Sequence, residues 1–149
     1  MKKYTNEVVI EASREKIIEL FENPDNLIKW QPGFISMKHI SGASGEIGSK
    51  YEMKYKMGKR DIVMIETVIE KKFHELYTFT YEAKGVWNEV SNHFEIIDEN
   101  TTKYWTENDF KMKGFMKLMA FFVPGVFKKQ SQKYLDLFKE FVEMEVSAS

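Results

Sequence analysis

Apolar and polar residues alternate with a period of two along most of the first 112 residues of the chain. Between residues 49 and 57, for example, Tyr51, Met53 and Tyr55 fall on one side of the pattern, and lysine or glutamate falls on the other. This alternation is typical of β-strands with one buried face. It predicts about seven strands, at residues 4–11, 34–41, 49–57, 60–71, 76–83, 86–97 and 102–112.

Two short helices are predicted after the first strand. Ser13 suits a helix N-cap, and Ile17 and Phe21 follow at helical spacing. At residues 23–25, Asn-Pro-Asp starts a second helix, because asparagine caps well and proline fits the first helical position. This second helix carries Trp30 and ends at the Gln-Pro-Gly that follows.

A long amphipathic helix is predicted after Pro124-Gly125. Its apolar residues recur at the i, i+3, i+4, i+7 spacing of one helix face. These residues are Phe127, Tyr134, Leu135, Phe138, Phe141 and Val142. Because the stripe is wide and aromatic, it needs a large concave partner, which a curved sheet would supply. A helix lying across such a sheet tends to enclose a pocket, so the pattern favours a fold that binds a small molecule.

The order of these elements defines the fold class. Strands at hairpin spacing make an antiparallel sheet, and 149 residues suit one domain, spanning residues 1–149, without a linker or repeat. We therefore predict an α+β fold. It comprises a curved antiparallel sheet of about seven strands around a long C-terminal helix, with two short helices after strand 1.

Composition narrows the possible functions. A net charge of −1 gives no basic field that would attract nucleic acid. The absence of cysteine excludes disulfides, thiolate nucleophiles and cysteine-ligated zinc. The histidines His39, His74 and His93 are scattered without metal-ligand spacing, so we expect no metal and no cofactor. We expect a monomer or homodimer.

The N-terminus lacks the apolar region of a signal peptide, so we expect a cytoplasmic protein. Residues 115–127 are largely apolar, but Lys117 and Pro124-Gly125 interrupt them. This stretch is also shorter than the roughly 20 residues that span a bilayer. We expect no stable membrane insertion, with transient contact left open. Residues 115–126 are instead interpreted as a lid over the pocket, hinged at Pro124-Gly125.

The inward faces of the predicted strands and the helix stripe supply the candidate ligand-binding residues. They combine aromatic and methionine side chains with a few amides and hydroxyls, as adaptable apolar pockets do. The candidates are Trp30, Tyr51, Met53, Tyr55, Phe79, Tyr81, Asn88, Asn92, Tyr104, Thr106, Asn108, Phe110, Met119, Phe127, Tyr134 and Phe138. The asparagine and threonine side chains could orient a ligand oxygen or could bond to one another or to water. The pattern supports both alternatives equally.

Glu66 is the one catalytic candidate, as a general acid or base. If it points inward together with Val68, loss of water raises its pKa. If Ile65 and Ile69 point inward, Glu66 is merely solvated. Residues 60–71 are apolar on both faces, so periodicity does not decide between the two phases, and this ambiguity slightly favours the solvated one.

Two stretches resemble the START-like superfamily, and most closely its polyketide cyclase/dehydrase-like (SRPBCC) branch. They are I-E-A-S-R-E-K-I-I-E-L-F-E-N-P-D-N-L-I-K-W-Q-P at residues 10–32 and G-E-I-G-S-K-Y-E-M at residues 45–53. The resemblance extends over essentially the whole chain and includes the long C-terminal helix. It implies a helix-grip fold, in which a seven-stranded antiparallel sheet grips the last helix around an apolar cavity. Members bind lipids, sterols, polyketides, quinones or plant hormones, and some are cyclases or aromatases.

Two function classes follow. The first, which we prefer, is reversible binding of an apolar or aromatic small molecule without turnover, because the expected cavity contains mainly neutral amides and hydroxyls. The second is a cyclase, dehydratase or isomerase acting on such a ligand. A Ser/His/Asp hydrolase is disfavoured, since the sequence has no nucleophile elbow.

Overall fold

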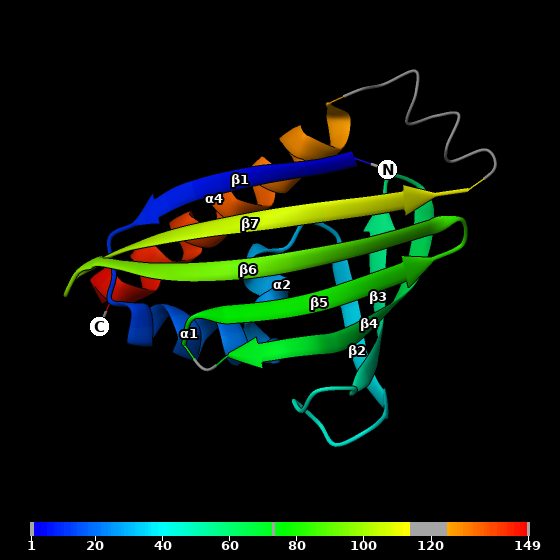
Figure 1. The fold of residues 1–149 in the computed structure, drawn as a ribbon, viewed down its shortest axis with the longest axis horizontal. Coiled ribbons are helices and arrows are strands. Elements are labelled where there is room, and N and C mark those ends of the chain that lie inside the picture. The colour runs from blue at the N-terminus through cyan, green and yellow to red at the C-terminus, as the bar shows by residue number, and fades with distance from the viewer. Residues whose placement is uncertain (1, 73, 114–124, 149) are drawn as a thin grey trace.

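The computed structural model describes residues 2–72, 74–113 and 125–148 (Figure 1). Its elements in chain order are β1 (Lys2–Ile10), α1 (Arg14–Glu22), the 3-10 helix η1 (Pro24–Asn26), α2 (Leu27–Trp30), β2 (Phe34–Ser41), β3 (Lys50–Met57), β4 (Arg60–Lys72), β5 (Leu76–Ala83), β6 (Val86–Asp98), β7 (Thr101–Met112) and α4 (Val126–Ala148). The predicted order of strand, two short helices, six strands and long helix is confirmed.

The strands form one antiparallel, seven-stranded sheet in the order β1-β7-β6-β5-β4-β3-β2. Consecutive hairpins build most of it, and β1 joins by pairing with β7 along its whole length. Register shifts between β2 and β3, β4 and β5, and β6 and β7 mark bulges, which increase the local twist. In Figure 1, β2 and β3 run steeply across the direction of β5, β6 and β7, and β4 bends from the first direction into the second. The predicted curved sheet is therefore confirmed.

The short helices start where their capping residues predict. The Ser13 hydroxyl accepts a hydrogen bond from the backbone N–H of Lys16 over 3.2 Å at the start of α1. The Asn23 side chain does the same for the backbone N–H of Asp25 over 3.0 Å, with proline next in the chain. Each cap satisfies a backbone donor that the first helical turn leaves without a partner.

Helix α4 lies on the concave side of the sheet and closes its β1 edge (Figure 1). The Gln132 side-chain nitrogen donates to the backbone oxygen of Glu7 over 3.1 Å, and the Lys139 ammonium donates to that of Val9 over 2.6 Å. An edge strand otherwise exposes unpaired backbone groups. Here the helix supplies partners for them, which fixes α4 along β1.

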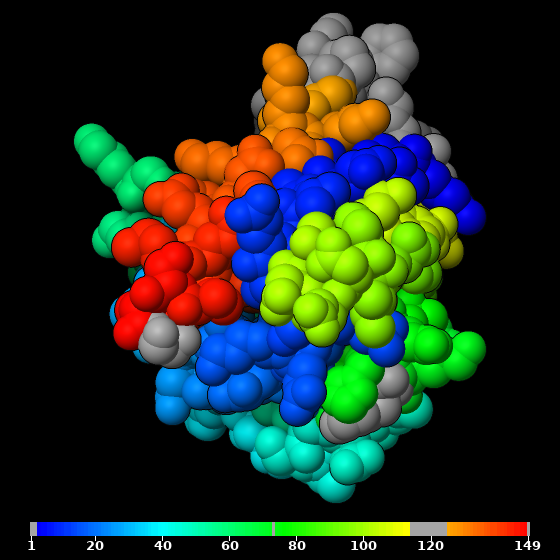
Figure 2. Space-filling view, turned by 90° about the vertical axis from the view of Figure 1, so that its left-hand side faces the viewer, coloured from blue at the N-terminus to red at the C-terminus, as the bar shows by residue number. Residues whose placement is uncertain are grey.

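One end of the interior is packed solid. Phe138 of α4 is completely buried, and the rings of Phe94 and Tyr104 stack at 4.7 Å beside it. Phe21 of α1 meets the Phe94 ring edge-on at 5.2 Å. Figure 2 shows this end of the molecule, where α1, the β6–β7 turn and the C-terminal part of α4 meet. Aromatic side chains thus close the interior here.

The chain leaves α2 through a turn that only glycine can form. Gly33 has a φ of +72°, and a Cβ there would lie 2.1 Å from the backbone oxygen of Lys56. The Lys56 N–H also donates to the Gly33 carbonyl over 2.7 Å. This close approach docks the end of α2 onto β3.

Some residues singled out by the sequence pattern lie outside the part of the chain that the structure describes. Met119 and all but the last two residues of the proposed lid fall within residues 114–124, outside the described residues. None of the helices in the described ranges is long and apolar enough to cross a membrane.

Candidate functional site

A row of side chains crosses the concave face of the sheet at the level of Glu66. Cross-strand pairing sets Glu66 opposite Tyr51 on β3 and opposite Tyr81 on β5. Tyr81 in turn lies opposite Asn88 on β6, and Asn88 lies opposite Phe110 on β7. Directly opposed residues share a face of the sheet and lie close enough to interact. We call these five residues the Glu66 row.

Glu66 points into the interior. Only 8% of its surface is exposed, whereas 42% of Ile69 is exposed. The solvated orientation that the sequence slightly favours is therefore wrong. The alternation is hidden because Thr67, on the opposite face, is also buried, and its hydroxyl accepts a hydrogen bond from the Lys50 ammonium over 2.9 Å. A bulge after Val68 then changes the phase of the strand.

Burial sets the acid–base behaviour of Glu66. Loss of water disfavours the charged form and raises the pKa of the carboxyl from 4.5 to about 7. A hydrogen bond with the Tyr81 side chain opposes this shift without cancelling it. Near neutral pH the carboxyl is thus poised between its two protonation states, as a general acid or base requires.

The phenols of Tyr81 and Tyr55, near Glu66, stay protonated. Burial raises the pKa of Tyr81 well above its usual value, and the nearby Glu66 charge adds to the shift. Burial likewise raises the pKa of Tyr55, whose hydroxyl donates to Oε1 of Gln31 over 2.6 Å. Gln31 is thus a site residue that the sequence pattern did not predict. In the sequence, Gln31 stands out only as part of the Gln-Pro-Gly that ends α2. That motif predicts a turn and does not indicate a ligand site.

The glycine-containing loop between β2 and β3 fixes Tyr51. The Tyr51 hydroxyl accepts a hydrogen bond from the backbone N–H of Gly45 over 2.6 Å and lies 3.0 Å from the Ser44 hydroxyl. This loop is a turn between β2 and β3. Its role at the site is to orient one end of the Glu66 row.

The Glu66 row belongs to the more accessible part of the concave face. Phe79, Tyr81 and Phe110 are half-buried, whereas Phe94 and Phe138 at the packed end are almost or completely buried. Burial nevertheless raises the pKa of the Tyr81 phenol strongly. Tyr81 is thus largely surrounded by protein and still exposes part of its surface.

The helix side of the site is aromatic. The Phe127 ring stacks on Phe110 with 5.0 Å between centroids. Trp30 of α2 meets Phe138 edge-on at 4.9 Å and meets Tyr134 edge-on at 6.3 Å. Among these candidates, Phe127 contacts Phe110, and Trp30 contacts both Tyr134 and Phe138, which belongs to the packed core. Met53, another candidate on β3, is 1% exposed within the core cluster beside the site.

Both polar groups of the Asn92 side chain form hydrogen bonds within the protein. Its amide nitrogen donates to the backbone oxygen of Tyr77 over 3.1 Å, and its oxygen accepts from the Tyr104 hydroxyl over 2.7 Å. All three residues are buried. This arrangement is the internal hydrogen bonding that the sequence analysis kept as one of its two alternatives.

The other inward polar residues form a chain across β6 and β7. The Asn88 amide nitrogen lies 3.3 Å from the Asn108 side-chain oxygen, and the Asn108 amide nitrogen lies 3.4 Å from the Thr106 hydroxyl. Asn108 and Thr106 are buried, but Asn88 is half-buried. Among the described residues, none donates a hydrogen bond to the Asn88 oxygen. Asn88 is thus the amide best placed to meet a ligand.

The histidines lie apart from the Glu66 row's carboxyl. On the outer face, His93 stacks on Trp105 with 3.8 Å between centroids, and its Nε2 lies 3.0 Å from a Glu107 oxygen. His39 is exposed, and its ring centroid lies 5.2 Å from that of Tyr51. Within residues 2–72, 74–113 and 125–148, no group of three or more histidine or acidic side chains could hold a metal ion.

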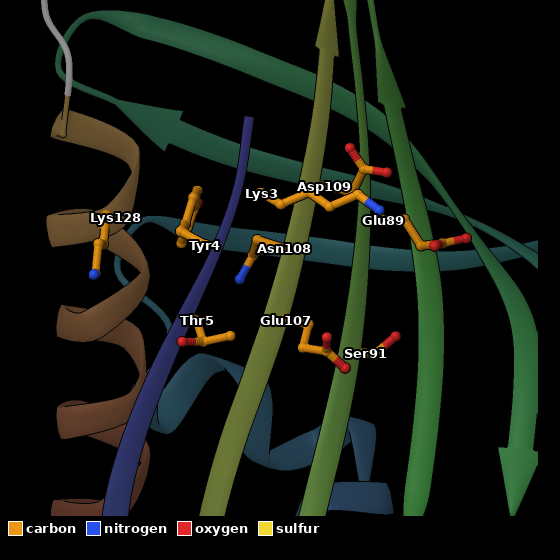
Figure 3. A pocket seen from close by; sticks show the side chains of 9 residues that line it. All are labelled: Lys3, Tyr4, Thr5, Glu89, Ser91, Glu107, Asn108, Asp109 and Lys128. Atoms are coloured by element: carbon orange, nitrogen blue, oxygen red, sulfur yellow. The ribbon is translucent and has the colours of Figure 1, made fainter. Parts of the chain in front are cut away.

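Two open hollows lie near the β1 edge, with volumes of ≈ 570 Å³ and ≈ 370 Å³. The side chains around the larger one come from β1, β6, β7 and α4, and most are charged or polar (Figure 3). They are Lys3, Tyr4, Thr5, Glu89, Ser91, Glu107, Asn108, Asp109 and Lys128. This polar, open surface does not match the apolar ligand predicted from the sequence.

No protein-family model and no curated protein matches the chain. Solved structures do match it. The Zhui aromatase/cyclase from Streptomyces sp. R1128 superposes with a TM-score of 0.81 at 10% identity, over 97% of this chain and 95% of that one. A START superfamily protein from Mycobacterium smegmatis gives a TM-score of 0.73 at 15% identity, over 98% and 97% of the two chains.

Norcoclaurine synthase from Thalictrum flavum, in complex with dopamine and hydroxybenzaldehyde, gives a TM-score of 0.70 at 18% identity. That match covers 95% of this chain and 86% of the synthase. Near-complete coverage by these structures confirms the predicted START-like, helix-grip fold. The low identities establish the fold alone, and function has to be argued from the site.

Proposed function

We propose that the protein reversibly binds an apolar or aromatic small molecule between the concave face of the sheet and α4. The proposal rests on a difference in side-chain exposure between two parts of the interior. Phe79, Tyr81 and Phe110 keep exposed surface on the concave face, while the end around Phe138 is closely packed. Burial of an apolar ligand against these rings would remove apolar surface from water, which stabilises the complex by about 25 cal/mol per Å².

The polar groups of the Glu66 row would orient the ligand. A few well-placed polar groups in an apolar site fix a ligand's orientation. The Asn88 oxygen can accept a hydrogen bond from a ligand hydroxyl, and the Glu66 carboxyl lies one strand beyond Tyr81 on the same face. The two groups therefore lie on either side of Tyr81. This separation suits a ligand with polar atoms at two positions of an otherwise apolar body.

The structural neighbours are consistent with this class of ligand. The norcoclaurine synthase complex contains dopamine and hydroxybenzaldehyde, which are small aromatic molecules. Because the identity is 18%, this supports the choice of aromatic ligands for a first screen and does not identify the ligand.

A binding screen tests the proposal. A fluorescent apolar probe and a panel of fatty acids, flavonoids and quinones are titrated against the protein, and the melting temperature is recorded with each ligand. A ligand at 100 times its dissociation constant should add about 2.7 kcal/mol to the free energy of unfolding. If neither the probe nor any panel member binds, the proposal is wrong.

Two matched variants locate the site. Asn88→Ala should weaken binding of oxygenated ligands more than that of pure hydrocarbons, because it removes a hydrogen-bonding group and leaves the aromatic surface. Ser91→Ala, on the outer face of the same strand, should leave both affinities unchanged. Equal effects of the two variants would place the ligand elsewhere.

A second candidate function is acid–base catalysis of the cyclase, dehydratase or isomerase type. It is favoured by one observation, the inward carboxyl of Glu66 with a pKa of about 7. Any ligand found in the screen should be incubated with the protein and analysed by mass spectrometry. If the protein converts the ligand, and Glu66→Gln abolishes the conversion but still binds the ligand, catalysis is established. If the ligand is recovered unchanged, the protein binds it without turnover.

A further inference from the structure

The Glu66 carboxyl has no cationic partner among the residues that the structure describes. The ion pairs within those ranges all involve other acidic residues. Among the described residues, the titratable groups that interact with Glu66 are the phenols of Tyr51, Tyr55 and Tyr81. Lys50, on the neighbouring strand, bonds Thr67 on the opposite face of the sheet. An acidic group is therefore buried among neutral aromatic side chains.

This arrangement is energetically unusual. A buried carboxylate is expensive unless a cation or hydrogen bonds compensate it. Tyr81 supplies a hydrogen bond to Glu66. Glu66 keeps 8% of its surface exposed, and no described residue other than Tyr81 hydrogen-bonds its carboxyl.

The surroundings favour a cation at that surface. Tyrosine and tryptophan rings carry negative charge density on their faces and attract cations held within about 6 Å. Tyr51 and Tyr81 flank Glu66 directly, and Tyr55 lies close enough for its pKa to be affected by the Glu66 charge. A carboxylate flanked by phenol rings can bind an ammonium group through both its charge and the ring faces.

We propose that the ligand of this protein is an amphipathic amine, whose protonated nitrogen pairs with the Glu66 carboxylate between Tyr51 and Tyr81 while its apolar body lies along Phe79 and Phe110. This inference rests on the proposed binding function and names its ligand class. It assigns Glu66 a recognition role: the carboxylate selects amines over neutral molecules of the same shape.

The pairing predicts a pH dependence. In the free protein the pKa of Glu66 is about 7, so at pH 6 most of the carboxyl is protonated and has to lose its proton before it pairs. Amine affinity should therefore rise about tenfold from pH 6 to pH 8, and fall again above the amine's own pKa, near 10. Burial raises the pKa of Tyr55, Tyr81 and Tyr134, so these neighbours stay neutral in this window. Burial also acts to raise the pKa of Tyr51, but hydrogen bonds with Ser44, Ser49 and the Gly45 backbone outweigh it and lower that pKa. His39, which is exposed beside Tyr51, is tested separately with His39→Gln.

The experiment uses probes of equal shape: tryptamine against tryptophol, and 2-naphthylmethylamine against 2-naphthylmethanol. Dissociation constants are measured by isothermal titration calorimetry at pH 6 and pH 8 on the full chain, the Glu66→Gln and His39→Gln variants, and Glu82→Gln. Glu82 is an exposed carboxylate on the outer face of β5, so its removal controls for general loss of negative charge. Circular dichroism verifies that every variant is folded.

At pH 8 the amines should bind at least about tenfold more tightly than the alcohols, as a charge-assisted hydrogen bond worth roughly 1.5–3 kcal/mol implies. Glu66→Gln should remove this preference and its pH dependence while alcohol binding persists. The Glu82→Gln and His39→Gln variants should behave as the unmodified protein does. At pH 6, titrations in two buffers of different ionisation enthalpy should show release of about one proton per amine bound.

Equal binding of amines and alcohols at pH 8 would overturn the inference, and so would an amine preference that survives Glu66→Gln. Tighter binding of the alcohols at low pH would also overturn it, because Glu66 would then act as a neutral hydrogen-bond donor. In each of these cases apolar molecules still bind, and the proposed function stands. If the broader ligand panel also fails to bind, the proposed function itself is wrong.

Discussion

Replacement of Glu66 by glutamine should change how the stability of the protein depends on pH. In the folded protein, burial raises the pKa of this carboxyl from 4.5 to about 7. Below pH 4.5 the group is protonated in both the folded and the unfolded state, so it does not affect stability. As pH rises toward 7 the unfolded chain releases its proton first, and the free energy of unfolding falls. Above pH 7 both states are ionised and the full penalty is reached.

The size of the effect follows from the shift. A change of one pKa unit corresponds to 1.36 kcal/mol. The full penalty of the buried Glu66 carboxylate is therefore about 3 kcal/mol, and most of it should develop between pH 5 and pH 8. Glutamine has nearly the same shape and cannot ionise. The Glu66→Gln variant should thus match the unmodified protein at pH 5 and exceed its stability at pH 8.

Urea denaturation at pH 5 and pH 8, followed by circular dichroism, measures the difference. The quantity of interest is the change in free energy of unfolding between the two pH values, compared between the unmodified protein and Glu66→Gln. The exposed Glu82→Gln variant serves as the control and should follow the unmodified protein. If Glu66→Gln loses as much stability between pH 5 and pH 8 as the unmodified protein does, the carboxyl is not desolvated and the reasoning fails.

Two further substitutions test the fold that positions the site. Phe138→Ala should lower the free energy of unfolding by about 3–5 kcal/mol, because the side chain is completely buried between α4 and the sheet, and an unchanged melting temperature would contradict that packing. Gly33→Ala should destabilise more than Gly58→Ala. Both glycines have positive φ, but a Cβ meets the backbone oxygen of Lys56 only at Gly33 and has open space at Gly58, so equal losses in thermal unfolding would refute the clash.

Local patterns in the sequence determined the elements of this protein. A period of two marks a strand when one face is buried and the other is wet, which holds for β3, where Tyr51 and Met53 are buried and Lys54 is exposed. Ser13 and Asn23 announce helix starts because their side chains satisfy neighbouring backbone donors. The aromatic stripe of α4 required a concave sheet, and Leu135 and Phe138 are indeed buried against it.

Tertiary structure decided the orientation of Glu66. In β4, residues 66, 67 and 68 are all buried, because side chains of the neighbouring strands cover both faces and a bulge shifts the phase after Val68. A period of two is not visible in such a strand, so its inward face cannot be read from sequence. Gln31 was missed for a related reason, since its partner Tyr55 lies 24 residues later in the chain.

For the polar side chains of the interior, too, the sequence determined one property and the tertiary structure another. The sequence placed Asn88, Asn92 and Asn108 on one inward pattern but did not distinguish their roles. Their roles depend on hydrogen bonds between strands: Asn92 is satisfied by Tyr77 and Tyr104, whereas Asn88 keeps a free oxygen within the described residues. Periodicity specifies the face on which a side chain lies. The pairing register and the curvature of the sheet determine which groups meet across it, and these arise only when distant strands assemble.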